Sequence, residues 1–105
     1  SFMEPEFAPV REDIEKLLNS SIEGRFEYIE KIKEKKEFLQ ALLFYFRNLL
    51  HKQITNYDAA VQQNVTNSQI KDFLKELLQA EEWAKQNVNI RGILEYLMLK
   101  MPKTD

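Results

Sequence analysis

The sequence has no cysteine and very little glycine or proline, and each absence excludes a class of protein. Without cysteine, neither a disulfide framework nor a thiolate metal site can form. Two glycines and three prolines in 105 residues leave few turns, which favours long helices. Two glycines are also too few for a glycine-rich loop that binds phosphate.

Long apolar runs and a strong charge imbalance are missing as well. No stretch approaches the roughly 20 apolar residues that span a bilayer, and the N-terminus has no signal-peptide layout. The 15 basic and 17 acidic residues give a net charge of −2, which argues against a nucleic-acid-binding face. We therefore expect a cytoplasmic domain without membrane segments or direct nucleic-acid contact.

Residues that would support catalysis or metal binding are sparse. His51 is the only histidine, so zinc would have to be held by carboxylates beside a single imidazole. No Glu-x-x-His motif and no Ser–His–Asp arrangement is indicated. Glu81 lies close to an apolar stripe, and a rim acid paired with a lysine is the favoured interpretation. We expect no catalytic, cofactor, metal or small-molecule site, and hence no enzyme activity in this fragment.

Apolar residues recur at helical spacing along most of the chain, and no strand-like alternation occurs. The pattern predicts a first helix from Pro9 to near Asn19 and a second that starts at a Ser20–Glu23 capping box and ends in the charged run from Lys31 to Glu37. A third is predicted from Glu37 to Lys52 or as far as Tyr57 and beyond, a fourth from Ser68 to Gln86 after a Thr66–Gln69 capping box, and a fifth from Ile90 to Met101. Residues 56–67 either extend the third helix or form a surface loop. The fold class is therefore all-α, a single bundle of about five helices over residues 9–102. We expect residues 1–8 to be a ragged segment that includes residues left by an expression vector, and residues 103–105 to be a tail.

Several large side chains fall off the apolar stripes of their helices, namely those of Phe44, Trp83, Tyr96 and Leu99. Clustered exposed aromatics mark partner surfaces, whereas a central helix buries two faces within one chain. For Phe44 the intramolecular interpretation is favoured, and for the other three both stay open. Three glutamates, Glu30, Glu34 and Glu37, interleave with the four lysines of residues 31–36, which is typical of a solvated helix face.

The segment Asn87-Val88-Asn89, followed by Arg91 and Leu94-Glu95, resembles the closing helix of the C-terminal domain of bacterial clamp-loader subunits. These are the delta-prime and gamma/tau subunits of DNA polymerase III. Residues 37–50, an apolar run ending in Arg-Asn-Leu-Leu, are similar to the central helix of that family. Residues 20–33, which contain Gly24-Arg25-Phe26, are similar to the short helix that precedes it.

The resemblance implies an oligomerisation domain that joins its counterparts in other clamp-loader subunits into a collar. AAA+ modules, absent from this chain, would then load the sliding clamp during DNA replication. Because the chain stops after the last helix, it is more similar to delta-prime, with gamma/tau as the alternative.

The helical wheel, not the family, suggests the contact residues. Trp83, Tyr96 and Leu99 would form the apolar centre of an interface, with Arg47 and Arg91 at its rim and Phe44 as a further candidate. A rival hypothesis is a free-standing helical adaptor unrelated to replication, which binds a partner helix in a groove. A small ligand-binding bundle is a second rival, and nothing in the sequence marks its pocket.

Overall fold

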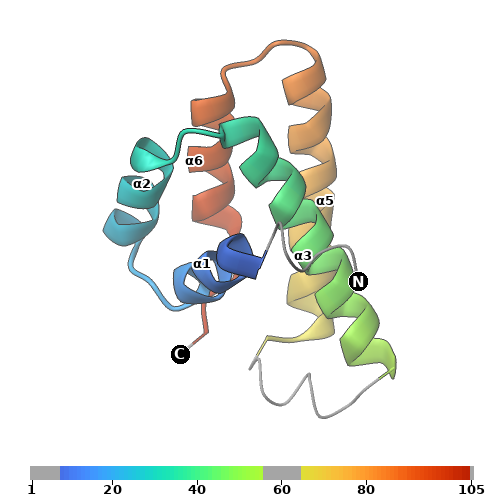
Figure 1. Ribbon diagram of the computed structural model, residues 1–105. Coiled ribbons are helices and arrows are strands. Elements are labelled where there is room, and N and C mark those ends of the chain that lie inside the picture. The colour runs from blue at the N-terminus through green and yellow to red at the C-terminus, as the bar shows by residue number, and fades with distance from the viewer. Residues whose placement is uncertain (1–7, 56–64, 105) are drawn as a thin grey trace.

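Five helices make up the described part of the chain, which a computed structural model covers at residues 8–55 and 65–104 (Figure 1). They are α1 (Ala8–Leu18), α2 (Ile22–Lys31), α3 (Lys35–Thr55), α5 (Asn67–Lys85) and α6 (Ile90–Lys100). No strand occurs at the described positions, so the predicted all-α bundle is confirmed. None of the helices in these two ranges is long and apolar enough to cross a membrane.

The start of α5 follows the predicted cap chemistry. The Thr66 hydroxyl accepts a hydrogen bond from the Gln69 N–H at 3.1 Å, and the Gln69 side chain accepts from the Thr66 N–H at 2.9 Å. This reciprocal capping box satisfies two backbone donors that have no partner within the helix. The prediction of a Thr66–Gln69 capping box is confirmed.

The capping box predicted at Ser20–Glu23 is wrong by one residue. Ser21 caps α2, because its side chain accepts a hydrogen bond from the Gly24 N–H at 3.1 Å. The Ser20 hydroxyl instead donates to the Lys16 carbonyl of α1 at 2.7 Å, so it closes the preceding helix. Two adjacent serines therefore serve two different helix ends.

Helix α3 packs against α1, α5 and α6, and α6 packs against α2, α3 and α5. Figure 1 shows α6 between α2 and α5, with α1 crossing near its C-terminal end. All five helices contribute fully buried side chains to one core, among them Ile14, Ile29, Leu42, Phe46, Phe73, Leu77, Leu94 and Leu97. The rings of Phe46 and Phe73 meet edge to face at 4.8 Å between centroids, which joins α3 to α5.

The predicted ambiguity at residues 56–67 falls mostly on positions outside the described residues. Helix α3 is described as far as Thr55, so its extension to Tyr57 is not covered, and α5 begins at Asn67. Gln53 is buried near the end of α3, and its Nε2 donates to the Val65 carbonyl at 2.6 Å. This bond ties the end of α3 to the residues that lead into α5.

Candidate functional site

The junction between α5 and α6 is built by the Asn-Val-Asn segment. Asn87 has a φ of 64°, and its N–H donates to the Ala84 carbonyl at 3.2 Å. The Val88 N–H donates to the Trp83 carbonyl at 3.0 Å, which completes a Schellman motif at the end of α5. Asn89 then caps α6, because its Oδ1 accepts from the Arg91 N–H at 3.0 Å. The two asparagines thus have separate roles, one ending a helix and one starting the next.

Trp83 of α5 and Tyr96 of α6 are in direct contact. Their rings meet edge to face with 5.3 Å between centroids. The Tyr96 hydroxyl donates to Glu76 Oε1 at 2.7 Å, and Lys100 Nζ lies 5.5 Å from the centroid of the Tyr96 ring. The hydrogen bond to Glu76, together with desolvation, raises the pKa of Tyr96 above its ordinary value. We call these four residues, Glu76, Trp83, Tyr96 and Lys100, the aromatic seam.

Leu99 is the most exposed large apolar side chain in the described residues, at 57%. It follows Tyr96 by three positions, so the two side chains lie on neighbouring parts of the α6 surface. Trp83 and Tyr96 are themselves only partly buried, packed against the edge of the core. Leu99 and the seam therefore form an exposed strip of mixed apolar and polar character along α6.

The other three candidate residues are one arginine of α6 and two residues of α3. Arg91 is exposed, and its Nε donates to Glu95 Oε2 at 3.2 Å, an i,i+4 ion pair on α6. Phe44 is partly buried and Arg47 is exposed, and both lie on α3. The structure thus brings Trp83 and Tyr96 together, keeps Arg91 and Leu99 on the same helix as Tyr96, and places the α3 pair on a different helix.

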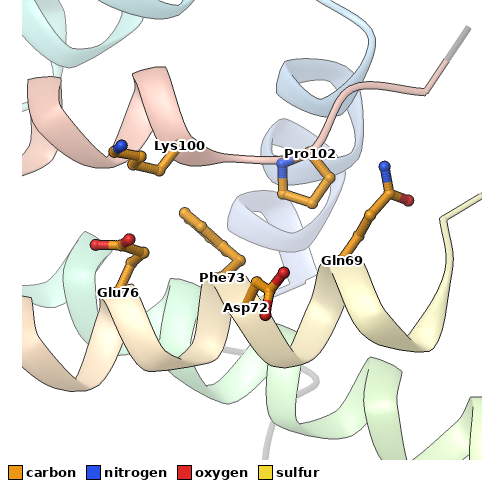
Figure 2. A pocket seen from close by; sticks show the side chains of 6 residues that line it. All are labelled: Gln69, Asp72, Phe73, Glu76, Lys100 and Pro102. Carbon is orange, nitrogen blue, oxygen red and sulfur yellow. The ribbon is translucent and has the colours of Figure 1, made fainter.

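A hollow of about 250 Å³ opens beside the seam, between α5 and the end of α6 (Figure 2). It is lined by Gln69, Asp72, Phe73, Glu76, Lys100 and Pro102. Phe73 and Pro102 are buried and form apolar lining, while Asp72 and Lys100 are exposed. Sequence patterns did not indicate this hollow, because it depends on how the end of α6 lies across α5. No group of three or more metal-ligating side chains forms within the described residues.

Sequence reasoning also missed Arg25, which is 2% exposed in the middle of α2. Its backbone position falls between Ile22 and Ile29 on the apolar stripe of α2, and this was the available signal. A charged residue on such a stripe needs partners in the interior. Arg25 has five of them, all backbone carbonyls near the ends of α1 and α6.

No protein-family model, curated protein or solved structure matches this chain in the comparisons with known proteins.

Proposed function

We propose that this chain is an oligomerisation domain of a clamp-loader subunit, most similar to delta-prime, which packs through the α6 strip against the C-terminal domains of other subunits. Leu99 carries the proposal, because an exposed leucine at 57% beside an aromatic pair is the kind of centre that a protein interface covers. The domain itself performs no catalysis and contacts neither nucleic acid nor membrane. It acts in the cytoplasm, where replication takes place.

The residues that carry the family resemblance have structural roles that suit this proposal. Asn87 and Asn89 form the junction before α6, and Arg91 pairs with Glu95 on its outer surface. The junction fixes the direction of α6 relative to α5, so the strip has one defined orientation. A rigid surface loses little conformational entropy when a partner docks, and this increases affinity.

The composition of the strip also supports a protein partner. Trp, Tyr and Arg are the residues that most often dominate binding energy at interfaces. Trp83 and Tyr96 are held in place by their mutual contact and by the Glu76 bond, so they are preorganised. Arg91 is held by Glu95 and would exchange this exposed pair for a partner carboxylate at modest cost.

The rival function is a free-standing helical adaptor with no role in replication, and gamma/tau is the alternative identity within the loader. The adaptor accounts for the same exposed leucine and aromatic pair. What distinguishes it is the partner: the collar proposal requires binding to C-terminal domains of other clamp-loader subunits. An AAA+ module encoded upstream in the same gene would favour the loader.

The test is size-exclusion chromatography with light scattering on this chain, alone and mixed with the C-terminal domain of the gamma/tau subunit of the same organism. We expect a mixed complex whose dissociation constant rises about tenfold in the Leu99→Ala variant, equivalent to about 1.4 kcal/mol. Leu78→Ala is the matched control, because Leu78 is an exposed leucine at 46% that lies about 140° around α5 from Trp83.

Two unchanged monomer peaks would count against the collar proposal and favour the adaptor. A mixed complex that Leu99→Ala and Leu78→Ala weaken equally would support the partner but contradict the α6 strip as the contact surface.

A further inference from the structure

Arg25 is the only charged residue that is buried among the described residues, and every N–H of its guanidinium points at a backbone carbonyl. Nε donates to Leu17 at 2.8 Å, Nη1 to Met98 at 2.8 Å and Met101 at 3.1 Å, and Nη2 to Leu18 at 3.4 Å and Pro102 at 2.9 Å. It forms no ion pair with any described residue. A single side chain from α2 therefore satisfies carbonyls from two other parts of the chain.

These carbonyls belong to the C-terminal ends of α1 and α6. The last carbonyls of a helix have no partner within it, and that end of the helix carries partial negative charge. Two such ends meet at one guanidinium, so the fold compensates the buried positive charge without a carboxylate. Burial lowers the pKa of Arg25, yet arginine stays protonated in proteins.

Residues 101–104, which we call the C-terminal strap, leave α6 at this point. Met101 is 4% exposed and Pro102 is buried, and the Thr104 N–H donates to the Leu18 carbonyl at 2.9 Å. Figure 2 shows Pro102 near Phe73 of α5, at one side of the hollow. The strap is thus fastened at its inner end by Arg25 and at its outer end by Thr104, and it covers apolar surface of the bundle.

We infer that Arg25 is a latch which holds the C-terminal strap closed, and that the strap opens as a separate unit when the latch is lost. Among the described residues, the backbone of the strap donates one hydrogen bond to α1, from Thr104, and one to α6, from Met101, whereas Arg25 donates to the two strap carbonyls of Met101 and Pro102. Without the guanidinium, the carbonyls of Met101 and Pro102 would be buried without donors, and swinging out restores them to water. Opening would uncover the apolar surface around Phe73. This inference does not depend on the proposed function.

Amide hydrogen exchange, measured by NMR on the whole chain, tests the latch. In the wild type we expect the Met101 and Thr104 amides to be protected, because they donate to Leu97 and Leu18. In Arg25→Met we expect both to exchange within tenfold of the unprotected rate, while the Phe46 and Leu77 amides still exchange at least a thousandfold more slowly than unprotected ones. Arg47→Met, the same change at an exposed arginine of α3, should leave the strap amides as they are in the wild type.

Two results with Arg25→Met would overturn the latch. Protected strap amides would show that the strap stays closed without the guanidinium, and loss of protection throughout the bundle, or failure to fold, would show that the strap is not a separate unit.

A second variant keeps the test independent of how Arg25→Met folds. Thr104→Pro removes the outer N–H donor and leaves Arg25 intact. If Arg25 is the latch, the Met101 amide keeps its protection in this variant. Fast exchange of the Met101 amide would assign the fastening to Thr104 and contradict the inference.

Discussion

Helices α5 and α1 end by two different physical solutions to the same problem. At the end of α5 the carbonyls of Trp83 and Ala84 accept hydrogen bonds from Val88 and Asn87, residues that follow immediately in sequence. At the end of α1 the Leu17 carbonyl also accepts a local hydrogen bond, from the Ser20 N–H at 3.1 Å, but Arg25 donates in addition to the carbonyls of Leu17 and Leu18 and to carbonyls 73 to 77 residues away at the end of α6. The first solution is local, and the second joins three segments of the chain.

The difference decides what each end contributes to the fold. A left-handed residue terminates a helix and sets the direction of the next one, but it holds no third element. A buried guanidinium joins whatever its five donors reach, at the cost of desolvating a charge. In this protein both solutions also position α6. The asparagine junction that ends α5 sets where α6 starts, and the Arg25 side chain that caps α1 also binds carbonyls at the end of α6. Helix α6 carries the proposed contact strip.

The largest effect on stability is expected from removing the guanidinium of Arg25. Arg25→Met should lower the free energy of unfolding by about 3 kcal/mol, because several buried carbonyls lose their donors while the core loses little volume. Urea denaturation followed by circular dichroism measures this value. Arg25→Lys, which keeps the charge but not the five-donor fork, should fall between Arg25→Met and the wild type. If the free energy of unfolding fell by less than about 1 kcal/mol in Arg25→Met, the hydrogen bonds of Arg25 would contribute little to stability.

Substitutions at Asn87, the left-handed residue that ends α5, should be able either to lower or to raise the stability of the fold. Asn87→Ala should cost about 1 kcal/mol, because a Cβ without a compensating side-chain bond is strained at a φ of 64°. Asn87→Gly should be neutral or stabilising by a few tenths of a kcal/mol, since glycine adopts this conformation without strain. The same denaturation series measures both. If the alanine variant were as stable as the glycine variant, the left-handed junction would not be present in solution.

Tyr28 extends the comparison to pH, because it, like Arg25, joins α2 to α1 through a hydrogen bond. Its hydroxyl donates to Asp13 Oδ2 at 3.0 Å, and burial, followed by this bond and the Asp13 charge, raises its pKa above the ordinary value. The stabilising contribution is therefore complete below about pH 10, where unfolded tyrosine ionises, and is lost as the pH rises above it. Tyr28→Phe should cost about 1 kcal/mol at neutral pH and make unfolding less steeply dependent on pH between about 10 and 11. Equal slopes for the two proteins would contradict the raised pKa.

The smallest effect concerns Gly92, in the first turn of α6. Nothing lies within 4 Å of a Cβ built at this position, and the residue is exposed. Gly92→Ala should raise the free energy of unfolding by about 0.5 kcal/mol, because alanine loses less backbone entropy in a helix. Thermal denaturation measures the change in stability. A less stable alanine variant would show that there is too little room for a Cβ at this position.

The same contrast explains what the sequence could predict. Helix positions, the Thr66 capping box and the Asn87–Asn89 break depend on neighbours within a few residues, and periodicity and cap chemistry indicated all of them. The prediction that Ser20 caps α2 failed because the Ser20 hydroxyl donates to the Lys16 carbonyl of α1. In α6, Met101 proved to be the C-cap rather than the last helical residue.

Contacts between distant segments were harder to foresee. Trp83 and Tyr96 were singled out because they lie off the stripes of their own helices, but their mutual contact depends on how α5 packs beside α6. Arg25 was overlooked because its partners lie at two helix ends that only the tertiary fold brings together. A helical wheel describes one helix, so it cannot reveal either contact.

The most direct test of this account is the NMR spectrum of the arginine side chains. In the whole chain at 25 °C, the Arg25 guanidinium should give separate, slowly exchanging Nε–H and Nη–H signals, because five hydrogen bonds prevent its rotation. Arg47 and Arg91, which are exposed, should give averaged Nη signals in the same spectrum and serve as internal controls. Averaged, fast-exchanging Arg25 signals would contradict the hydrogen bonds by which Arg25 joins α1, α6 and the C-terminal strap.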